Sequence, residues 1–284
     1  NPSLVGSEMC IRDSSIFFPT IAMLLIVGAF AGILAGLLGV GGGIVLVPAF
    51  FYAFNSLGYF NEQLMQVCVA TSLATIVFTS IRSVLSHNKK KMVEWRILKL
   101  WSPGIVLGAI MGVLIASKLH SDSLTIIFGS LGILIGLYMA FSKKEWSLGN
   151  TMPVGFLRTL ISSVVGFLSV LMGIGGGSLA VPLMTLHKVN IHKAVATGAG
   201  FGLVIALPSS FGFLITHPPL AGLPPMTIGY INIPAFLIII SMTMITAPMG
   251  ASLAHKLNVI VLKRTFAFFL ISVAINMLYK SYFT

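Results

Sequence analysis

The sequence predicts an all-α, polytopic membrane protein with about eight to ten transmembrane or re-entrant helices in two internal repeats. Three observations lead to this fold class. Of the 284 residues, 57% are hydrophobic and 8% are charged, and the mean hydropathy is +1.02, whereas soluble domains carry about 25% charged residues. Apolar runs of spanning length recur along the chain, and one glycine-rich stretch occurs twice.

The apolar runs define the expected helices. They lie at about residues 16–38, 44–60, 64–86, 97–117, 123–141, 153–173, 178–188, 191–215, 228–252 and 260–281. Most are close to the roughly 20 residues that a spanning helix needs, but 178–188 is too short for a straight crossing. We therefore expect 178–188 to be a half-helix, and 44–60 to be either partly re-entrant or a thin crossing.

The repeated glycine stretch predicts two helix breaks. Gly39-Val40-Gly41-Gly42-Gly43 is followed by Pro48, and Gly173-Ile174-Gly175-Gly176-Gly177 is followed by Pro182. Each glycine costs a helix about 1 kcal/mol against alanine, and the proline favours a new helical start. In lipid, a break needs protein or a polar cavity around its freed backbone groups, so two matched breaks predict a paired internal site.

Other matches extend this duplication and define the expected domains. Ala70-Thr71 matches Ala196-Thr197, and Met111-Gly112 matches Met249-Gly250. We expect a disordered leader or a cloning or assembly scar, a first transmembrane repeat, a cytoplasmic linker and a second repeat, at residues 1–15, 16–142, 143–152 and 153–284. Cytoplasmic loops collect Lys and Arg, and placing the basic loops there favours five passes per half, which makes the repeats inverted.

The acidic residues argue against cation transport. All six lie in the leader or near the ends of apolar runs, whereas proton relays and Na⁺ sites usually use a carboxylate inside a span. An anion fits better, because a helix N-terminus offers free N–H donors and the positive end of the helix dipole. The predicted substrate-binding residues are Gly41, Gly42, Gly43, Thr71, Ser72, Gly175, Gly176, Gly177, Ser178 and Thr197.

Plainer interpretations of these residues remain open. Glycines in membrane helices often serve close packing, and most Ser and Thr hydroxyls there bond their own backbone. Adjacent glycines, however, do not share one packing face. Catalysis, a metal site and a disulfide framework are not expected, because Ser178 has no histidine in mid-span to act as its base and the His and Cys residues show no ligand spacing.

The chain resembles the sulfite exporter TauE/SafE family, also called the toluene sulfonate uptake permease family, over about residues 16–282. The doubled Gly-x-Gly-Gly-Gly-x-x-x-x-Pro carries this resemblance. Further matching segments are Ala70-Thr71-Ser72, Ser86-His87, Val93-Glu94-Trp95, Leu223-Pro224-Pro225, Gly229-Tyr230-Ile231-Asn232 and Ala247-Pro248-Met249-Gly250-Ala251. Only the leader departs plainly from the family pattern.

The resemblance implies a multi-pass permease in a bacterial-type plasma (inner) membrane. Its expected cargo is a small sulfur-containing anion such as sulfite, a sulfonate or sulfoacetate, moved outward, without enzymatic activity, cofactor or metal. The lipid bilayer and the anion are the expected partners; nucleic acid is not, and a homo-oligomer is left open. Two alternatives stand beside this hypothesis: a non-transporting scaffold or accessory subunit, and a transporter of another small solute or of a metal cation.

Overall fold

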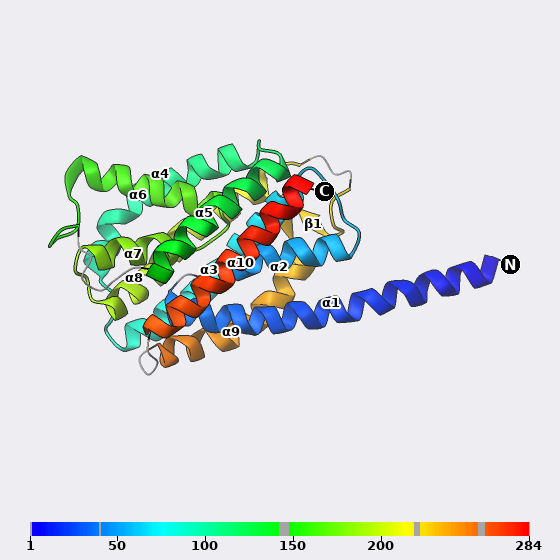
Figure 1. Cartoon of the computed structure of the whole chain (residues 1–284), viewed down its shortest axis with the longest axis horizontal. Helices are drawn as coiled ribbons and strands as arrows, with labels where there is room; N and C mark the ends of the chain where they lie inside the picture. Colours follow the sequence, from blue (N-terminus) through cyan, green and yellow to red (C-terminus); the bar gives the residue numbers. More distant parts are fainter. Residues whose placement is uncertain (1, 40, 142–147, 219–221, 255–258, 284) are drawn as a thin grey trace.

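The computed structural model describes residues 2–39, 41–141, 148–218, 222–254 and 259–283, and within them the chain forms ten helices (Figure 1). The first half contains α1 (Pro2–Leu38), α2 (Gly43–Ser56), α3 (Leu64–Lys89), α4 (Trp95–Ala116) and α5 (Ser121–Phe141). The second half contains α6 (Gly155–Leu171), α7 (Gly177–Leu186), α8 (Ile191–Ile215), α9 (Ile233–Leu253) and α10 (Val259–Phe283). The predicted all-α class is confirmed.

Six of these helices are long and apolar enough to cross a bilayer, on length and composition: Pro19–Leu38 of α1, and α3, α4, α5, α8 and α9. The helix α7 has only 10 residues and therefore rises about 15 Å, half the thickness of the hydrocarbon core. The prediction of a short helix after the second break is confirmed. With 14 residues, α2 is also shorter than an ordinary crossing.

The helix α3 lies at the centre of the packing. It contacts α8 and α9 extensively and also touches α1, α2 and α5. In its most apolar window 83% of the residues are buried, against 28 to 50% in the other five candidate spans. The side chains of α3 therefore face protein on nearly all sides, which makes any polar group on this helix informative.

The outer helices pack across the two halves. α1 lies along α9, α4 lies along α6, and α5 lies along α10, while α3 and α8 pack on each other. If each helix of the first half is matched with the helix five places later, the α1–α9 contact becomes the α6–α4 contact. The α3–α9 contact likewise becomes the α8–α4 contact. This exchange supports the two-repeat organisation, which remains a prediction.

Two features differ from the sequence-based expectation. The expected helix at 228–252 begins only at Ile233, because the strands β1 (Thr227–Ile228) and β2 (Ile231–Asn232) form a short antiparallel hairpin before it. Gly229 in the turn has φ +58°, and a Cβ there would lie 2.4 Å from the carbonyl oxygen of Phe213, so this tight turn against α8 requires glycine.

The expected leader is the second difference. Residues 2–15 are helical and continue into the packed part of α1, whose first turns project beyond the other helices (Figure 1). Helix propagation adds one backbone hydrogen bond for each residue fixed, so a packed helix readily extends outward. Half of the expected linker 143–152, residues 143–147, lies outside the described residues, and the domain boundaries remain predictions.

Candidate functional site

The first glycine break separates α1 from α2. Gly41 and Gly42 have φ values of +77° and +79°, a backbone conformation that side chains strongly disfavour. Gly42 then serves as the N-cap of α2, whose first residue is Gly43. The tight reversal therefore depends on glycine at the positions where the sequence predicted a break, and that break is confirmed.

The second break separates α6 from α7 and leaves backbone donors free. α6 ends at Leu171, Gly176 is the N-cap of α7, and α7 starts at Gly177. Among the described residues, the N–H groups of Gly175, Gly176 and Gly177 have no hydrogen-bond acceptor. These three N–H groups lie at the positive end of the α7 dipole, which is the usual setting for an anion.

The two breaks pack directly against each other. A Cβ built on Gly41 would lie 3.3 Å from the Cα atom of Gly175, and one built on Gly43 would lie 2.3 Å from the carbonyl oxygen of Gly173. Ile76 of α3 fills the adjoining space, because its side chain would lie 2.9 to 3.0 Å from the same two added Cβ atoms. The breaks therefore meet at the buried centre, with α3 beside them.

The two predicted serines already donate their protons to the second break. The Oγ atom of Ser72 donates to the carbonyl oxygen of Gly173 at 2.8 Å, and the Oγ atom of Ser178 donates to that of Gly175 at 3.2 Å. A hydroxyl has a single proton to give. These serines therefore fix the shape of the break, and in this arrangement they have no donor left for an anion.

The two predicted threonines accept hydrogen bonds, whereas the two serines donate them. Thr71 Oγ1 accepts a hydrogen bond from the backbone N–H of Asn232 at 3.0 Å, and Thr197 Oγ1 accepts one from the backbone N–H of Glu94, also at 3.0 Å. Both threonines are fully buried. Because each one accepts, its own O–H proton remains to be donated, so Thr71 and Thr197 are the better hydroxyl donors of the predicted set.

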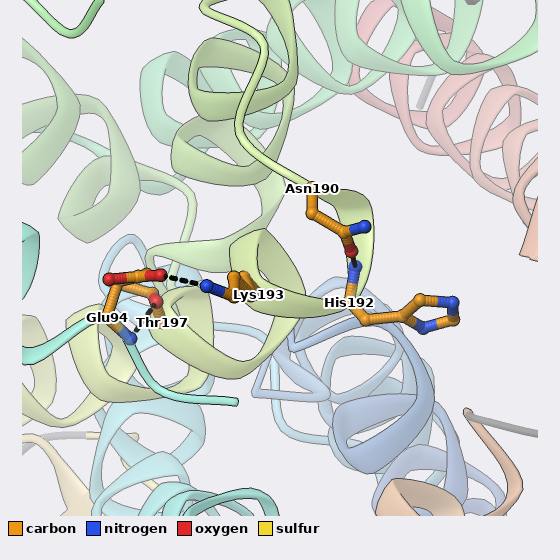
Figure 2. A network of polar contacts seen from close by, with 5 residues as sticks. All are labelled: Glu94, Asn190, His192, Lys193 and Thr197. Carbon is orange, nitrogen blue, oxygen red and sulfur yellow. Dashed lines mark hydrogen bonds and ion pairs between the residues drawn. The ribbon is translucent and has the colours of Figure 1, made fainter. Parts of the chain in front are cut away.

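Each threonine also holds the start of a helix from the other half of the chain. Asn232 is the N-cap of α9, and Glu94 is the N-cap of α4. Figure 2 shows the second of these contacts, where the Glu94 carboxylate turns to Lys193 of α8, with Nζ 2.6 Å from Oε1. In the same view Asn190 Oδ1 accepts from the His192 backbone N–H and caps α8, while the His192 ring points away from the ion pair.

The sequence did not identify three residues that shape the candidate site: Glu94, Asn232 and Ile76. Glu94 and Asn232 stand in motifs that carry the family resemblance, yet composition and spacing assign them no role. Aligning the two halves would have paired them, since each precedes the helix that follows a matched Ala-Thr. Ile76 is an ordinary apolar residue in an apolar run, and no sequence signal distinguishes it.

The acids described in the structure lie at helix ends. Glu62 precedes α3, Glu94 caps α4 and Asp122 stands in the first turn of α5. Glu145 lies outside the described residues, and the side chains of Glu8 and Asp13 are likewise not described. Across the described ranges, no group of three His, Cys, Asp or Glu residues could hold a metal ion.

A surface hollow on α9 is separate from these residues. It is lined by Pro248, Met249, Ser252 and Leu253. None of the predicted site residues borders it, and it contains no ionisable side chain. The hollow therefore adds nothing to the argument for a binding site at the glycine breaks.

Central packed helices, paired breaks and a largely apolar exterior define an integral, multi-pass membrane protein. The family model described as "Sulfite exporter TauE/SafE" matches residues 24–277, and the chain belongs to this family. A probable membrane transporter protein of Haemophilus influenzae is 35% identical over 264 residues, covering 93% of this chain and 100% of that protein. The probable membrane transporter protein YunE of Bacillus subtilis is 29% identical over 282 residues, covering 92% and 98% of the two chains.

Proposed function

We infer that the protein is a membrane permease, and we propose that it carries small sulfur-containing anions of the sulfite, sulfonate and sulfoacetate class outward across a bacterial-type plasma membrane. Membership of the TauE/SafE family and the transporter names of its relatives support the permease. The same names give no reason to expect catalysis. The proposed cargo rests on the chemistry of the buried centre, and the proposed direction rests on the membrane potential.

The observation that carries the anion proposal is the set of free donors at the second break. Three consecutive N–H groups, from Gly175 to Gly177, lack acceptors among the described residues and stand at the N-terminus of α7. Unpaired buried backbone donors are costly, and an oxyanion would satisfy several of them at once. The glycines allow it to approach the backbone closely.

The threonines complete the proposed cradle. Thr71 on α3 and Thr197 on α8 each accept a backbone N–H and so retain an O–H proton, which in this proposal they donate to the anion. Ser72 and Ser178 support the carbonyl side of the break instead. In this proposal the anion is held by neutral donors and the helix dipole alone, so it can bind without a paired cation and leave again.

The membrane potential supplies the proposed direction. Moving one negative charge outward across 100 mV, negative inside, gains about 2.3 kcal/mol. An anion leaving the cell therefore needs no coupling ion, which agrees with the absence of a carboxylate in the middle of any described span. Uptake of the same anion would require such coupling.

The test is flux through proteoliposomes loaded with labelled sulfite or a short sulfonate. We expect protein-dependent efflux that rises when the outside is made positive, and loss of that efflux in Gly176→Val, where a Cβ would lie 2.6 Å from the Cβ of Phe201. Gly149→Val is the matched control, because Gly149 also belongs to a connection, its φ lies outside the left-handed region, and an added Cβ would come no closer than 3.4 Å, to His187 Cδ2.

Two results would overturn the proposal. Absence of potential-sensitive flux for every small anion tested would remove the anion class. Wild-type flux and wild-type heat protection by anions in Gly176→Val would remove the glycine breaks as the site. A stable partner on purification, together with no stabilisation by anions, would instead favour the scaffold or accessory subunit.

A further inference from the structure

One face of the central helix α3 carries polar side chains from the glycine breaks to the end of the helix, interrupted by the apolar Ile76. Six side chains on this face follow helical spacing and are at most 1% exposed: Ser72, Thr75, Thr79, Ser80, Ser83 and His87. Fifteen residues separate the first from the last, so the stripe extends about 22 Å along the helix axis. So many polar side chains on one face of the most buried candidate span of a membrane protein are expensive unless they are used.

Ordinary backbone bonding accounts for only part of this stripe. Thr75 Oγ1 donates to the Ser72 carbonyl oxygen at 2.6 Å, and Thr79 Oγ1 donates to that of Thr75 at 2.9 Å, as hydroxyls in membrane helices usually do. The Oγ atoms of Ser80 and Ser83 behave differently. Both are buried, and neither has a hydrogen-bond partner among the described residues.

Two unpartnered hydroxyls on a buried face indicate that a ligand or a water molecule binds there transiently. An unsatisfied buried donor costs about 1 to 3 kcal/mol, and two on adjacent turns call for a ligand or water. Gly202 lets the α8 backbone pack closely on Ser80, since an added Cβ there would lie 2.6 Å from Ser80 Oγ. The hydroxyls of Ser80 and Ser83 therefore remain free donors on α3, and α8 approaches the first of them through a residue that has no side chain.

The far end of the stripe reaches a basic surface. His87 Nε2 lies 3.1 Å from the carbonyl oxygen of Gly36, at the end of α1. Two residues later α3 ends, and Lys89, Lys90 and Lys91 are exposed. These lysines give a positive charge to the surface at this end of the stripe, which attracts anions and concentrates them there.

The corresponding face of α8 is apolar. Matching Thr71 with Thr197 pairs Thr75, Thr79, Ser80 and His87 with Phe201, Ile205, Ala206 and Phe213, all fully buried. Ser83 is paired with Ser209, whose Oγ donates to the Ile205 carbonyl oxygen at 2.7 Å. Phe213 also packs edge-on against Tyr230, with ring centroids 5.8 Å apart. The face that extends from the central breaks is therefore polar on α3, in the first repeat, and largely apolar on α8, in the second repeat.

We propose that the polar face of α3 from Ser72 to His87 is the route by which a hydrated oxyanion passes between the glycine breaks and the Lys89–Lys91 loop. The hydroxyls of Ser80 and Ser83 are its donors along the way. Phe201, Ile205 and Phe213 form the apolar seal on the matching face of α8. This route rests on the proposed function for its cargo, but not for its existence as a water-accessible path.

The test measures access to single cysteines with the membrane-impermeant anionic reagent sulfonatoethyl methanethiosulfonate. The full chain carrying Cys10→Ser is reconstituted, and Cys68, which is fully buried, gives the background rate. Ser80→Cys and Ser83→Cys are the two path variants. Ala206→Cys and Ser209→Cys are their matched controls on α8, and Lys90→Cys marks the side of the basic loop.

Thiols in water-accessible, electropositive surroundings react, whereas thiols in apolar surroundings are inert, so we expect the path cysteines to react about ten-fold faster than their α8 counterparts. The reaction should occur from the same side as that of Lys90→Cys. Equal rates at the α3 and α8 positions, or reaction from the other side, would overturn the path.

Sulfite flux in the same vesicles separates the two proposals. Labelling of the path cysteines, with no anion flux through the Cys10→Ser protein, would uphold the path and overturn the choice of cargo. Flux without labelling at Ser80→Cys or Ser83→Cys would overturn the path and leave the cargo standing.

Discussion

The Oγ atom of Ser72 donates a hydrogen bond to the carbonyl oxygen of Gly173 at 2.8 Å. This bond joins the middle of α3, in the first half of the chain, to the glycine break of the second half. Both residues are fully enclosed by protein. The central helix therefore sets the position of the second break directly, and changes in α3 act on the candidate site.

Removing this hydroxyl should loosen the second break. In Ser72→Ala the Gly173 carbonyl oxygen loses its donor, and interhelical hydrogen bonds in membrane proteins contribute about 0.6 kcal/mol on average and up to about 1.7. We expect a lower thermal midpoint in detergent. Ser130→Ala is the control, because Ser130 is exposed and, within the part of the chain that the structure describes, its hydroxyl bonds only the Ile127 carbonyl oxygen on its own helix. An unchanged midpoint in Ser72→Ala would contradict the prediction.

Shortening Ile76 should open a cavity against the first break. Ile76 is fully buried, and replacing a buried isoleucine by alanine costs about 2 to 5 kcal/mol of unfolding free energy. We expect Ile76→Ala to lower the thermal midpoint strongly, whereas Leu85→Ala, on the same helix at 54% exposure, should change it little. Similar losses in both variants would show that Ile76 is not packed as described.

At the start of α4, the threonine should matter more than the ion pair. The side chains of Lys193 and Glu94 are 46% and 35% exposed, and such pairs contribute about 0 to 1 kcal/mol. Thr197→Val leaves the part-buried Glu94 N–H without its acceptor, which costs toward the lower end of the roughly 1 to 3 kcal/mol of a buried donor. Thermal midpoints should therefore fall further in Thr197→Val than in Glu94→Gln.

Salt provides the control for that comparison. Screening weakens exposed ion pairs, so high salt should lower the midpoint of the unaltered protein slightly and that of Glu94→Gln less. The deficit of Thr197→Val should persist at every salt concentration. A deficit that disappears in high salt would assign it to charge instead.

The cap of α9 should be more costly to remove than the cap of α8. Asn232 Oδ1 accepts from the Ala235 N–H at 3.1 Å, and its Nδ2 donates to Pro225 and Thr227. Among the described residues, the Asn190 side chain makes only the local cap to the His192 N–H. Loss of a cap costs about 0.5 to 2 kcal/mol, and we expect Asn232→Ala to lie at the upper end and Asn190→Ala at the lower, measured by thermal unfolding.

The sequence predicts the helices well because lipid imposes a simple pattern. Apolar runs mark ten helices, and the glycines that start α2 and α7 are identified from composition and backbone cost alone. The β1–β2 hairpin is missed, since Ile228, Tyr230 and Ile231 are as apolar as the helix that follows them. The turn is recognised only from the close approach of Gly229 to α8, and that approach depends on tertiary packing, which the local sequence does not show.

The site is predicted in part, for a related reason. Repeat matching selects Thr71 and Thr197, but it cannot show that they accept from Asn232 and Glu94 rather than bonding their own helices. Hydroxyl chemistry likewise cannot distinguish Ser72, which supports a carbonyl group, from Ser80, which has no partner. Those distinctions depend on which helix packs against each hydroxyl. The local sequence does not predict how helices of the two halves pair.

That pairing has a consequence for biosynthesis. The first half of the chain emerges with α1 and α4 still lacking α9 and α6, the helices that they pack along. The contacts of Thr71 with Asn232 and of Thr197 with Glu94 also require both halves. The buried centre can close only after α9 has been inserted, so a ribosome that stalls within the second half leaves an inserted but unassembled protein for quality control to remove.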